Sequence, residues 1–140
     1  MAEHEPTVIA FVCNWCTYTA ADLAGTSRLV QPPNLRMIRM MCTGMVDPKY
    51  VIKALLEGAD AVLVSGCHPG DCHYINGNLK ARRRIKLLQE ILPTFGIDER
   101  RLKMTWIGAS EGIDFAETVR ALVQEVKSIG PNNMRTQMVL

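Results

Sequence analysis

The stretch TVIAFV at residues 7–12 is short, apolar and rich in β-branched residues, and it runs directly into Cys13. A run of this kind without helical spacing predicts a buried β-strand. Comparable apolar runs occupy residues 35–41, 61–65 and 102–107, which predicts four strands in total. Cysteines follow the first three strands, so the carboxyl ends of the strands are the first place to look for a functional site.

Helices are expected between these strands. The first covers residues 20–30, before a Gln-Pro-Pro-Asn break, and the second lies between the capping residue Asp47 and Gly58. Apolar residues recur at helical spacing over residues 81–92 and 115–129. This spacing predicts two further amphipathic helices, the last of which ends at a Gly-Pro pair.

The alternation of strands and helices indicates the fold class. It predicts an α/β fold with a parallel sheet, because each strand-helix-strand crossover is right-handed and packs back onto the sheet. We therefore expect a single flavodoxin-like domain over residues 1–130, with a four-stranded parallel sheet in the order 2-1-3-4 and helices on both faces. Residues 131–140 are expected to form a C-terminal tail.

The composition of the chain argues against several classes of protein. With 48% hydrophobic and 21% charged residues, its 140 residues are typical of one globular domain. A net charge of +2 gives no overall attraction to nucleic acid. The sequence has neither a signal peptide nor an apolar stretch of about 20 residues for spanning a membrane, so we expect a cytoplasmic protein. Thiols stay reduced there, and five cysteines then indicate metal binding or redox chemistry in preference to disulfides.

All five cysteines follow predicted strands. Cys13 and Cys16 follow the first strand, Cys42 the second, and Cys67 and Cys72 the third. In a parallel sheet these ends share one edge, and neighbouring strands lie about 4.8 Å apart. The thiols should therefore converge where open α/β sheets usually bind ligands. Free cysteine often serves as a small buried apolar residue, but five at one edge favour metal ligation.

The spacing of the cysteines favours an iron-sulfur cluster. Cys13 and Cys16 enclose two residues, and Cys67 and Cys72 enclose four. Both spacings occur in ligand sets of 2Fe-2S clusters. Together with Cys42, the chain offers five thiolates to a cluster that needs four. The sequence leaves open which cysteine is spare.

Helix and turn geometry near the cysteines would support such a site. The dipole at the start of the first helix would favour a thiolate at Cys16. Gly44, Gly66 and Gly70 either bring backbone N–H groups close to sulfur or serve as ordinary turn residues.

Histidines and aromatic residues also flank the cysteines. His68 and His73 are possible replacements for thiolates, as in Rieske-type centres. With five cysteines available, we interpret both as supporting or surface residues. Trp15 and Tyr18 either cover the site, meet a partner or pack on the sheet.

Three blocks of the sequence point to one family. They are CNWC at residues 13–16, CTG at residues 42–44 and GCHPGDCHY at residues 66–74. In this order they resemble the delta subunit of methyl-viologen-reducing hydrogenase. The likeness extends from about residue 8 to residue 129, which is nearly the whole chain.

The resemblance implies a non-catalytic 2Fe-2S electron-transfer subunit of a hetero-oligomer. Such a protein links a hydrogenase or a formate dehydrogenase to heterodisulfide reductase in methanogenic archaea and related anaerobes. It passes electrons to the flavin-bearing subunit of the reductase, where flavin-based electron bifurcation takes place. The family's cysteines carry over as Cys13, Cys16, Cys42, Cys67 and Cys72.

Three other functions fit parts of the sequence. A phosphatase-like thiol catalyst needs an arginine six residues beyond Cys13, and Thr19 occupies that position. A Cys-x-x-Cys dithiol redox protein would leave three cysteines unexplained. A structural zinc site uses the same thiolate ligands and stays open as an alternative.

A basic run precedes and enters the predicted third helix. We interpret it as a solvated or partner-docking face and expect no nucleic-acid binding, because the net charge is small and no binding motif accompanies it. The run consists of Lys80, Arg82, Arg83, Arg84 and Lys86.

Overall fold

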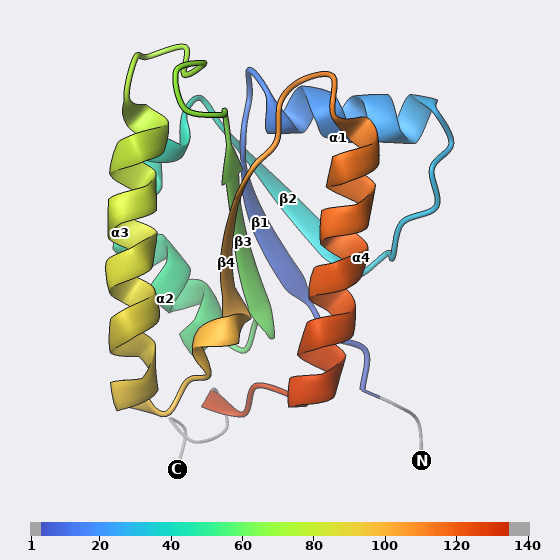
Figure 1. Ribbon diagram of the computed structural model, residues 1–140. Coiled ribbons are helices and arrows are strands. Elements are labelled where there is room, and N and C mark those ends of the chain that lie inside the picture. Colours follow the sequence, from blue (N-terminus) through green and yellow to red (C-terminus); the bar gives the residue numbers. More distant parts are fainter. Residues whose placement is uncertain (1–3, 135–140) are drawn as a thin grey trace.

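The computed structural model, which describes residues 4–134, confirms the predicted α/β fold and strand order. Four parallel strands form one sheet in the order β2-β1-β3-β4 (Figure 1). They are β1 (Val8–Cys13), β2 (Leu35–Met40), β3 (Ala61–Gly66) and β4 (Leu102–Trp106). Val8 pairs with Leu35 on one side and Ala61 on the other. The three strands therefore start level, and their carboxyl ends line one edge of the sheet.

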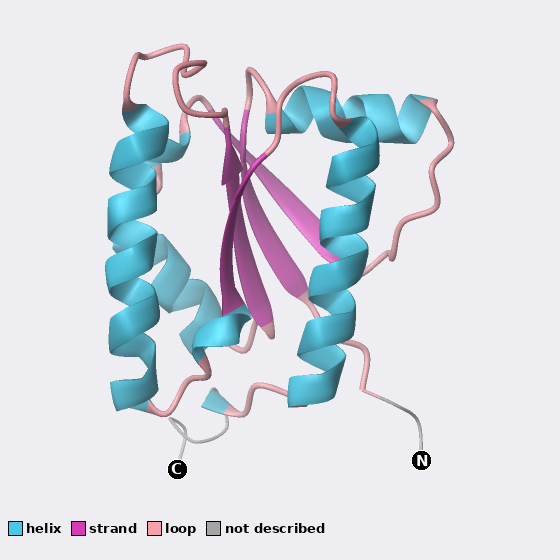
Figure 2. Cartoon of the chain, viewed as in Figure 1, coloured by secondary structure: helices cyan, strands magenta, loops and turns pink. Residues whose placement is uncertain are grey.

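Helices cover both faces of this sheet (Figures 1 and 2). α1 (Thr17–Thr26) and α4 (Gly112–Ile129) cover one face, and α2 (Pro48–Leu56) and α3 (Gly77–Ile91) cover the other. Short 3-10 turns lie in the connections: η1 (Thr43–Met45), η2 (Leu92–Phe95) and η3 (Glu99–Arg101). The result is three layers with a hydrophobic core on each side of the sheet.

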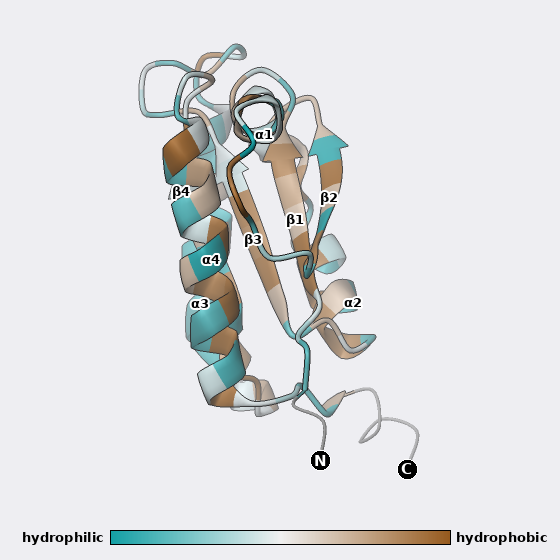
Figure 3. Cartoon of the chain, turned by 90° about the vertical axis from the view of Figure 1, so that its right-hand side faces the viewer, coloured by the Kyte–Doolittle hydropathy of each residue, from teal (hydrophilic) through white to brown (hydrophobic). Residues whose placement is uncertain are grey.

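Alternation along the central strands builds these two cores. Val8, Ala10 and Val12 pack towards α1 and α4, whereas Phe11 packs towards α2 and α3. β1 and β3 are apolar along most of their length (Figure 3), as expected for strands covered by helices on both faces. β2 differs, because residues 36–39 in its middle are exposed.

The first helix starts and ends earlier than predicted. α1 begins at Thr17, directly after Cys16, and ends at Thr26, whereas the apolar pattern predicted residues 20–30. Its first turn, Thr-Tyr-Thr, carries no apolar stripe that would reveal a helix. The early start is functionally relevant, because it places Cys16 at the amino end of the helix.

The end of α1 is a Schellman motif with an unusual residue. Arg28 has φ of 58°, and its N–H bonds to the Gly25 carbonyl while the Leu29 N–H bonds to the Ala24 carbonyl. Glycine is the usual residue at this left-handed position. Arginine there gives no stop signal in the sequence, so the apolar pattern predicts a helix that extends to residue 30.

The other helices begin near their expected signals. α2 lies between Asp47 and Gly58 as predicted, and the Asp47 carboxylate accepts the Lys49 N–H at 2.9 Å. α3 and α4 start at Gly77 and Gly112, a few residues before their apolar stripes.

Two further expectations concern membranes and the C-terminal tail. Within residues 4–134, the helices lack the combination of length and apolar character that crossing a bilayer requires. The tail predicted for residues 131–140 lies largely outside the described residues. In its described part, Asn132 donates from Nδ2 to the carbonyls of Leu55 and Ala59, each at 2.7 Å.

Candidate metal centre

Five cysteine side chains lie at the carboxyl-end edge of the sheet. Cys13 is the last residue of β1, and Cys16 caps the amino end of α1. Cys42 caps η1 shortly after β2, Cys67 follows β3, and Cys72 lies in the loop before α3. The structure thus brings all five thiols to the edge at which the sequence placed them.

Three of these cysteines form a buried group, which we call the triad: Cys13, Cys16 and Cys67. Their sulfur atoms lie within 4.8 Å of one another. The Cys67 Sγ is 3.7 Å from the Cys13 Sγ and 2.9 Å from the Cys16 Sγ. Three thiolates this close would repel one another, so the arrangement suits shared protons or a bound metal.

The remaining two cysteines form a second group, which we call the pair: Cys42 and Cys72. Their Sγ atoms are 3.8 Å apart. The Gly44 N–H donates to the Cys42 Sγ at 3.4 Å, one of the two roles that the sequence allowed for this glycine. Cys72 is partly accessible to solvent, whereas the other four cysteines are buried. The pair therefore forms the outer side of the site and the triad its inner side.

Gly77, at the start of α3, is a site residue that was not predicted from the sequence. A Cβ atom there would lie 2.2 Å from the Cys42 Sγ and 3.4 Å from the Cys72 Sγ. Only glycine leaves room for the pair in this position. For Gly66 and Gly70 the structure shows close packing and a left-handed turn with φ of 89°, the alternative role that the sequence allowed.

A buried hydroxyl network fixes the loop that carries Cys16. The Thr17 hydroxyl donates to the Ile107 carbonyl at 3.1 Å and lies 3.1 Å from the Ser65 hydroxyl. Thr105 donates to the same serine at 3.0 Å. These bonds tie the amino end of α1 to the ends of β3 and β4. They were not predicted, although hydroxyl residues at the ends of apolar strands were a visible signal.

Asn78 holds the loop after β3 and was not predicted either. Its side chain is buried, and Nδ2 donates to the carbonyls of Cys67 at 2.8 Å and His68 at 2.9 Å. A buried amide needs such partners, because leaving its donors unpaired would be costly. The first turn of α3 therefore sets the position of Cys67 as well as that of the pair.

Hydrogen bonding within the triad gives its thiols different pKa values. The hydrogen bond with Cys16 lowers the pKa of Cys13 to about 6, against the effect of burial. The same bond and burial raise the pKa of Cys16 far above its usual range. Burial raises the pKa of Cys67 to about 11. These directions favour the thiolate at Cys13 and the thiol at Cys16, so the thiolate expected at Cys16 from the helix dipole is wrong for the metal-free chain.

The two thiols of the pair shift in opposite directions. Burial raises the pKa of Cys42. Burial acts in the same sense on Cys72, but backbone N–H groups of Asn78, Tyr74 and Gly77 outweigh it, and the pKa of Cys72 is lowered overall. Two of these donors belong to the first turn of α3, where the helix dipole also favours negative charge.

The two histidines make their contacts away from the thiols. His68 bonds to the carboxylate of Glu111, and the ring of His73 stacks on Trp15 with the centroids 4.0 Å apart. These contacts agree with the interpretation of both as supporting or surface residues. Of the two aromatic residues considered with them, Tyr18 packs against the core beneath α1, and only Trp15 is exposed at the site.

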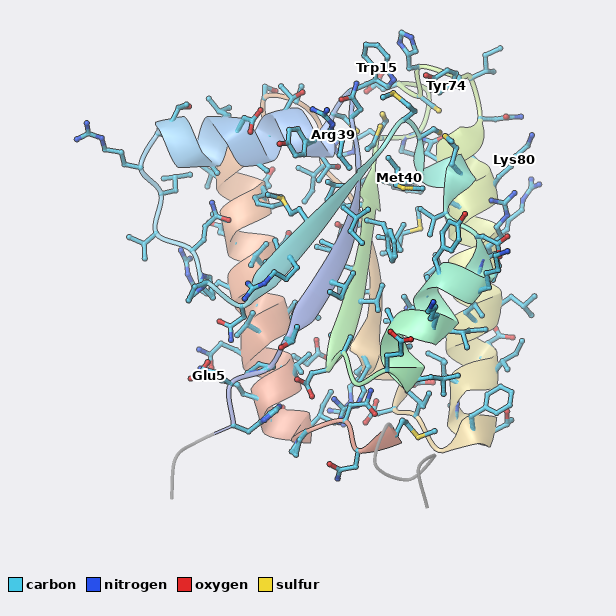
Figure 4. All side chains as sticks on the ribbon, turned by 180° about the vertical axis from the view of Figure 1, so that it is seen from behind. Glu5, Trp15, Arg39, Met40, Tyr74 and Lys80 are labelled. Carbon is cyan, nitrogen blue, oxygen red and sulfur yellow. The ribbon has the colours of Figure 1, made fainter. Side chains whose placement is uncertain are left out.

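Apolar side chains surround the pair at the surface. We call this surface the rim and define it as the exposed residues Trp15, Met41, Met45, Tyr74 and Ile75. Figure 4 shows Trp15 and Tyr74 at this edge, beside a group of sulfur atoms. Ile75 is 85% exposed and has φ of 77°, which β-branched residues rarely adopt. Backbone strain combined with exposed apolar side chains indicates a binding surface.

Part of the predicted basic run lies beside the rim. Lys80 and Arg84 line, together with Cys42, a cavity of about 470 Å³. Arg84 is only partly exposed, and its Nη1 donates to the Gly44 carbonyl. This contact fastens η1 to α3, so the run is more than a solvated helix face.

The donor set suits a thiophilic metal. Among the described residues, the grouped candidate ligands are Cys13, Cys16 and Cys67, without histidine or carboxylate, and the adjacent pair adds two more sulfur atoms. Soft thiolate ligands select zinc, copper(I) and iron-sulfur clusters. Gly77 leaves room for the Cys42 sulfur at this edge, and five thiols gathered there fit an iron-sulfur group.

Comparison with known proteins gives matches over nearly the whole chain. The family model described as methyl-viologen-reducing hydrogenase, delta subunit, matches residues 8–130. The vhc iron-sulfur subunit of the F420-non-reducing hydrogenase of Methanococcus voltae is 46% identical over 136 residues, covering 96% of this chain and 94% of the relative. The corresponding iron-sulfur subunit of Archaeoglobus profundus is 46% identical over 129 residues, covering 92% and 94%.

A further relative is much longer than this chain. It is one of the subunits of the ferredoxin/F420H2-dependent CoB-CoM heterodisulfide reductase of Methanosarcina acetivorans, and it is 48% identical over 126 residues. The match covers 90% of this chain but only 16% of the relative. In that protein, the region similar to this chain is part of one longer polypeptide.

Proposed function

We propose that this chain, which belongs to the family of methyl-viologen-reducing hydrogenase delta subunits, holds a 2Fe-2S cluster and relays single electrons within a hydrogenase and heterodisulfide reductase complex. The relatives named as hydrogenase iron-sulfur subunits support the carrier role. A bound cluster supplies one-electron redox chemistry, and the chain needs no general acid, base or nucleophile for it. The chain is then a non-catalytic cytoplasmic subunit of an oxidoreductase complex.

The observation that carries this proposal is the spacing of the sulfur atoms. With tetrahedral coordination and metal–sulfur bonds of about 2.3 Å, two thiolates on one ion lie about 3.8 Å apart. Cys13 and Cys67 are 3.7 Å apart, and Cys42 and Cys72 are 3.8 Å apart. Each couple matches the ligand spacing at one iron. We assign Cys13 and Cys67 to one iron of the cluster and Cys42 and Cys72 to the other.

Cys16 is the spare thiol in this assignment. Its Sγ lies 2.9 Å from the Cys67 Sγ, much closer than two ligands of one tetrahedral ion. As a thiol that binds no iron, Cys16 would be free to donate a hydrogen bond to the neighbouring ligand sulfur of Cys67. Hydrogen bonds to ligand sulfur are one of the features that set the potential of an iron-sulfur cluster.

A single structural zinc ion agrees less well with the sulfur positions. A zinc site with four cysteines needs all four sulfur atoms about 3.8 Å from one another. Among the described residues, the group within 4.8 Å has only three members. Cys42 and Cys72 form a separate pair beside it. This division supports two metal ions, each with two cysteine ligands.

The pair offers the route by which electrons enter or leave. Cys72 is partly exposed, and Cys42 lines the cavity beside the rim. A partner seated on the apolar rim would therefore approach the pair more closely than the buried triad. Lys80 and Arg84 at the same cavity favour a partner whose apolar centre is flanked by acidic residues.

The comparisons support a heterodisulfide reductase as one partner. In the Methanosarcina relatives, the region similar to this chain and the rest of a reductase polypeptide form one chain. Such a fusion supports direct contact between the same two units where they are separate chains. We propose the flavin-bearing subunit of the reductase as electron acceptor, with flavin-based bifurcation in that partner. A hydrogenase or a formate dehydrogenase of methanogenesis is the proposed donor.

Metal and sulfide analysis of protein purified without oxygen tests this function. The proposal requires about two iron atoms and about two acid-labile sulfide ions per chain, with a brown colour. Protein that contains about one zinc ion per chain and no sulfide would refute the electron-carrier function.

A further inference from the structure

We propose that the outer edge of β4 binds an extended acidic segment of the redox partner, which adds to the sheet as a fifth strand. The inference rests on the proposed function for the identity of the partner. Its structural evidence is separate, because it comes from β4 and α3 and not from the thiol groups.

One side of β4 has no strand partner. In the part of the chain that the structure describes, β4 pairs only with β3, and it lies at the front edge of the sheet between α3 and α4 (Figure 1). The Ile107 N–H bonds to β3. Backbone groups of successive residues alternate between the two sides of a parallel strand, so Met104 and Trp106 direct theirs outward. The outward Leu102 carbonyl accepts from the Gln89 side chain at 2.7 Å.

A trough of about 650 Å³ follows this edge. Residues 103–106 of β4 all line it. Because consecutive side chains of a strand point to opposite faces, a cavity that touches all four lies along the edge of the backbone. The opposite wall is one face of α3, and its residues recur at helical spacing. They are Arg82, Ile85, Lys86 and Gln89.

The trough is positively charged. Arg82, Lys86 and Lys103 line it and are exposed, and none of the described residues that line it is a carboxylate. His68 at one end is already bonded to Glu111. A bound strand with aspartate or glutamate side chains would therefore meet cations both from α3 and from β4.

Trp106 contributes an unpaired donor. Its Nε1 is buried without a hydrogen-bond partner among the described residues, and it belongs to a residue that lines the trough. The Arg82 guanidinium lies 5.6 Å from the centre of the Trp106 ring. Buried N–H groups nearly always have a partner. Because this nitrogen is closed to solvent, a carbonyl or carboxylate of the bound strand reaches it only if side chains of the trough shift.

These features together select an extended polypeptide. The outward N–H and C=O groups of Met104 and Trp106 need acceptors and donors in alternation, which a strand offers and a nucleic-acid backbone does not. A second copy of this chain is disfavoured, because pairing two β4 edges would bring the cations that line two such troughs together. An acidic strand from the partner satisfies both the backbone and the cations.

A peptide probe tests the trough independently of the cluster. A synthetic peptide of alternating Glu and Val should bind the full-length protein and slow amide exchange of residues 102–107 about tenfold, whereas a Lys-Val peptide should not. Met104→Pro removes one outward N–H and leaves the bonds to β3 intact, so it should weaken binding about tenfold. Lys103→Glu should weaken it similarly, while the matched change Arg36→Glu on the exposed strand β2 should have no effect.

The same readout applies to the complex with the reductase. Protection of residues 102–107 on complex formation, lost in Lys103→Glu and kept in Arg36→Glu, is the expected result. Unchanged exchange at β4 in a complex that forms normally would overturn the inference while leaving the proposed function intact. So would equal binding of the two peptides. Loss of the cluster with retained binding at β4 would instead count against the proposed function alone.

Discussion

A Cβ atom on Gly77 would lie 2.2 Å from the Cys42 Sγ, so the start of α3 leaves no room for a side chain against the cysteine after β2. The same turn of α3 donates N–H groups to Cys72 and holds the Cys67 carbonyl through Asn78. The outer half of the site therefore depends on how α3 begins.

Gly77→Ala should displace Cys42 and disrupt the pair. We expect a loss of most of the iron and a decrease of about 1–3 kcal/mol in the free energy of unfolding, the usual effect of overpacking. Iron analysis and denaturant unfolding would measure both effects. The matched control is Gly25→Ala in α1, where a Cβ meets no atom within 4 Å. It should stabilise the chain by about 0.5–1 kcal/mol. Normal iron content in Gly77→Ala would contradict the close fit.

Replacement of single cysteines tests the ligand assignment. Cys16→Ser should retain the cluster with a changed reduction potential, because a hydrogen bond near sulfur is altered but no ligand is lost. Serine at any of the four assigned ligands, Cys13, Cys42, Cys67 or Cys72, should remove the cluster or make it labile. Visible absorption and iron content of oxygen-free protein distinguish these outcomes. The assignment is wrong if Cys16→Ser loses the cluster and another variant keeps it.

Thr17→Val should destabilise the fold near the site. The change removes the buried donor to the Ile107 carbonyl and a partner of Ser65. We expect a loss of about 1–3 kcal/mol in the free energy of unfolding, measured by urea denaturation. Thr19→Val, at an exposed position in the same helix, should stay within about 0.5 kcal/mol of the original. Equal stabilities of the two variants would argue against the hydroxyl network.

Arg28→Gly should stabilise the protein. Residue 28 has φ of 58° in the Schellman ending of α1, where side chains other than glycine are strained. Relief of this strain should raise the free energy of unfolding by about 1 kcal/mol. The greater freedom of glycine in the unfolded chain offsets part of this gain. The unfolding midpoint measures the change. A lower midpoint would show that Arg28 makes a compensating contact.

Much of the architecture was predictable because its signals are local. The apolar run before Cys13 and the similar runs later in the chain mark buried strands, and right-handed crossovers leave few arrangements for them. Each of the first three strands is followed by at least one cysteine. Parallel strands bring their carboxyl ends together, so the shared edge could be predicted from order alone.

The details of the site depend on contacts between distant segments. Thr17 and Asn78 are ordinary loop or helix-start residues in the sequence, and their partners lie on other strands and loops. In the sequence Gly77 is an ordinary glycine near a helix start, and its importance depends on the contact with Cys42 from a distant segment. The division of the thiols into triad and pair likewise depends on loop conformations that spacing does not specify. The end of α1 could not be predicted because Arg28 occupies the left-handed position at which glycine usually marks the end of a helix.

Electron paramagnetic resonance of the reduced protein tests the central claim most directly. Protein purified without oxygen and reduced with dithionite should give the signal of a one-electron-reduced 2Fe-2S cluster at about one spin per chain. The same signal should persist in Cys16→Ser. A colourless protein with no signal after reduction, or with about one zinc ion per chain, would contradict the account.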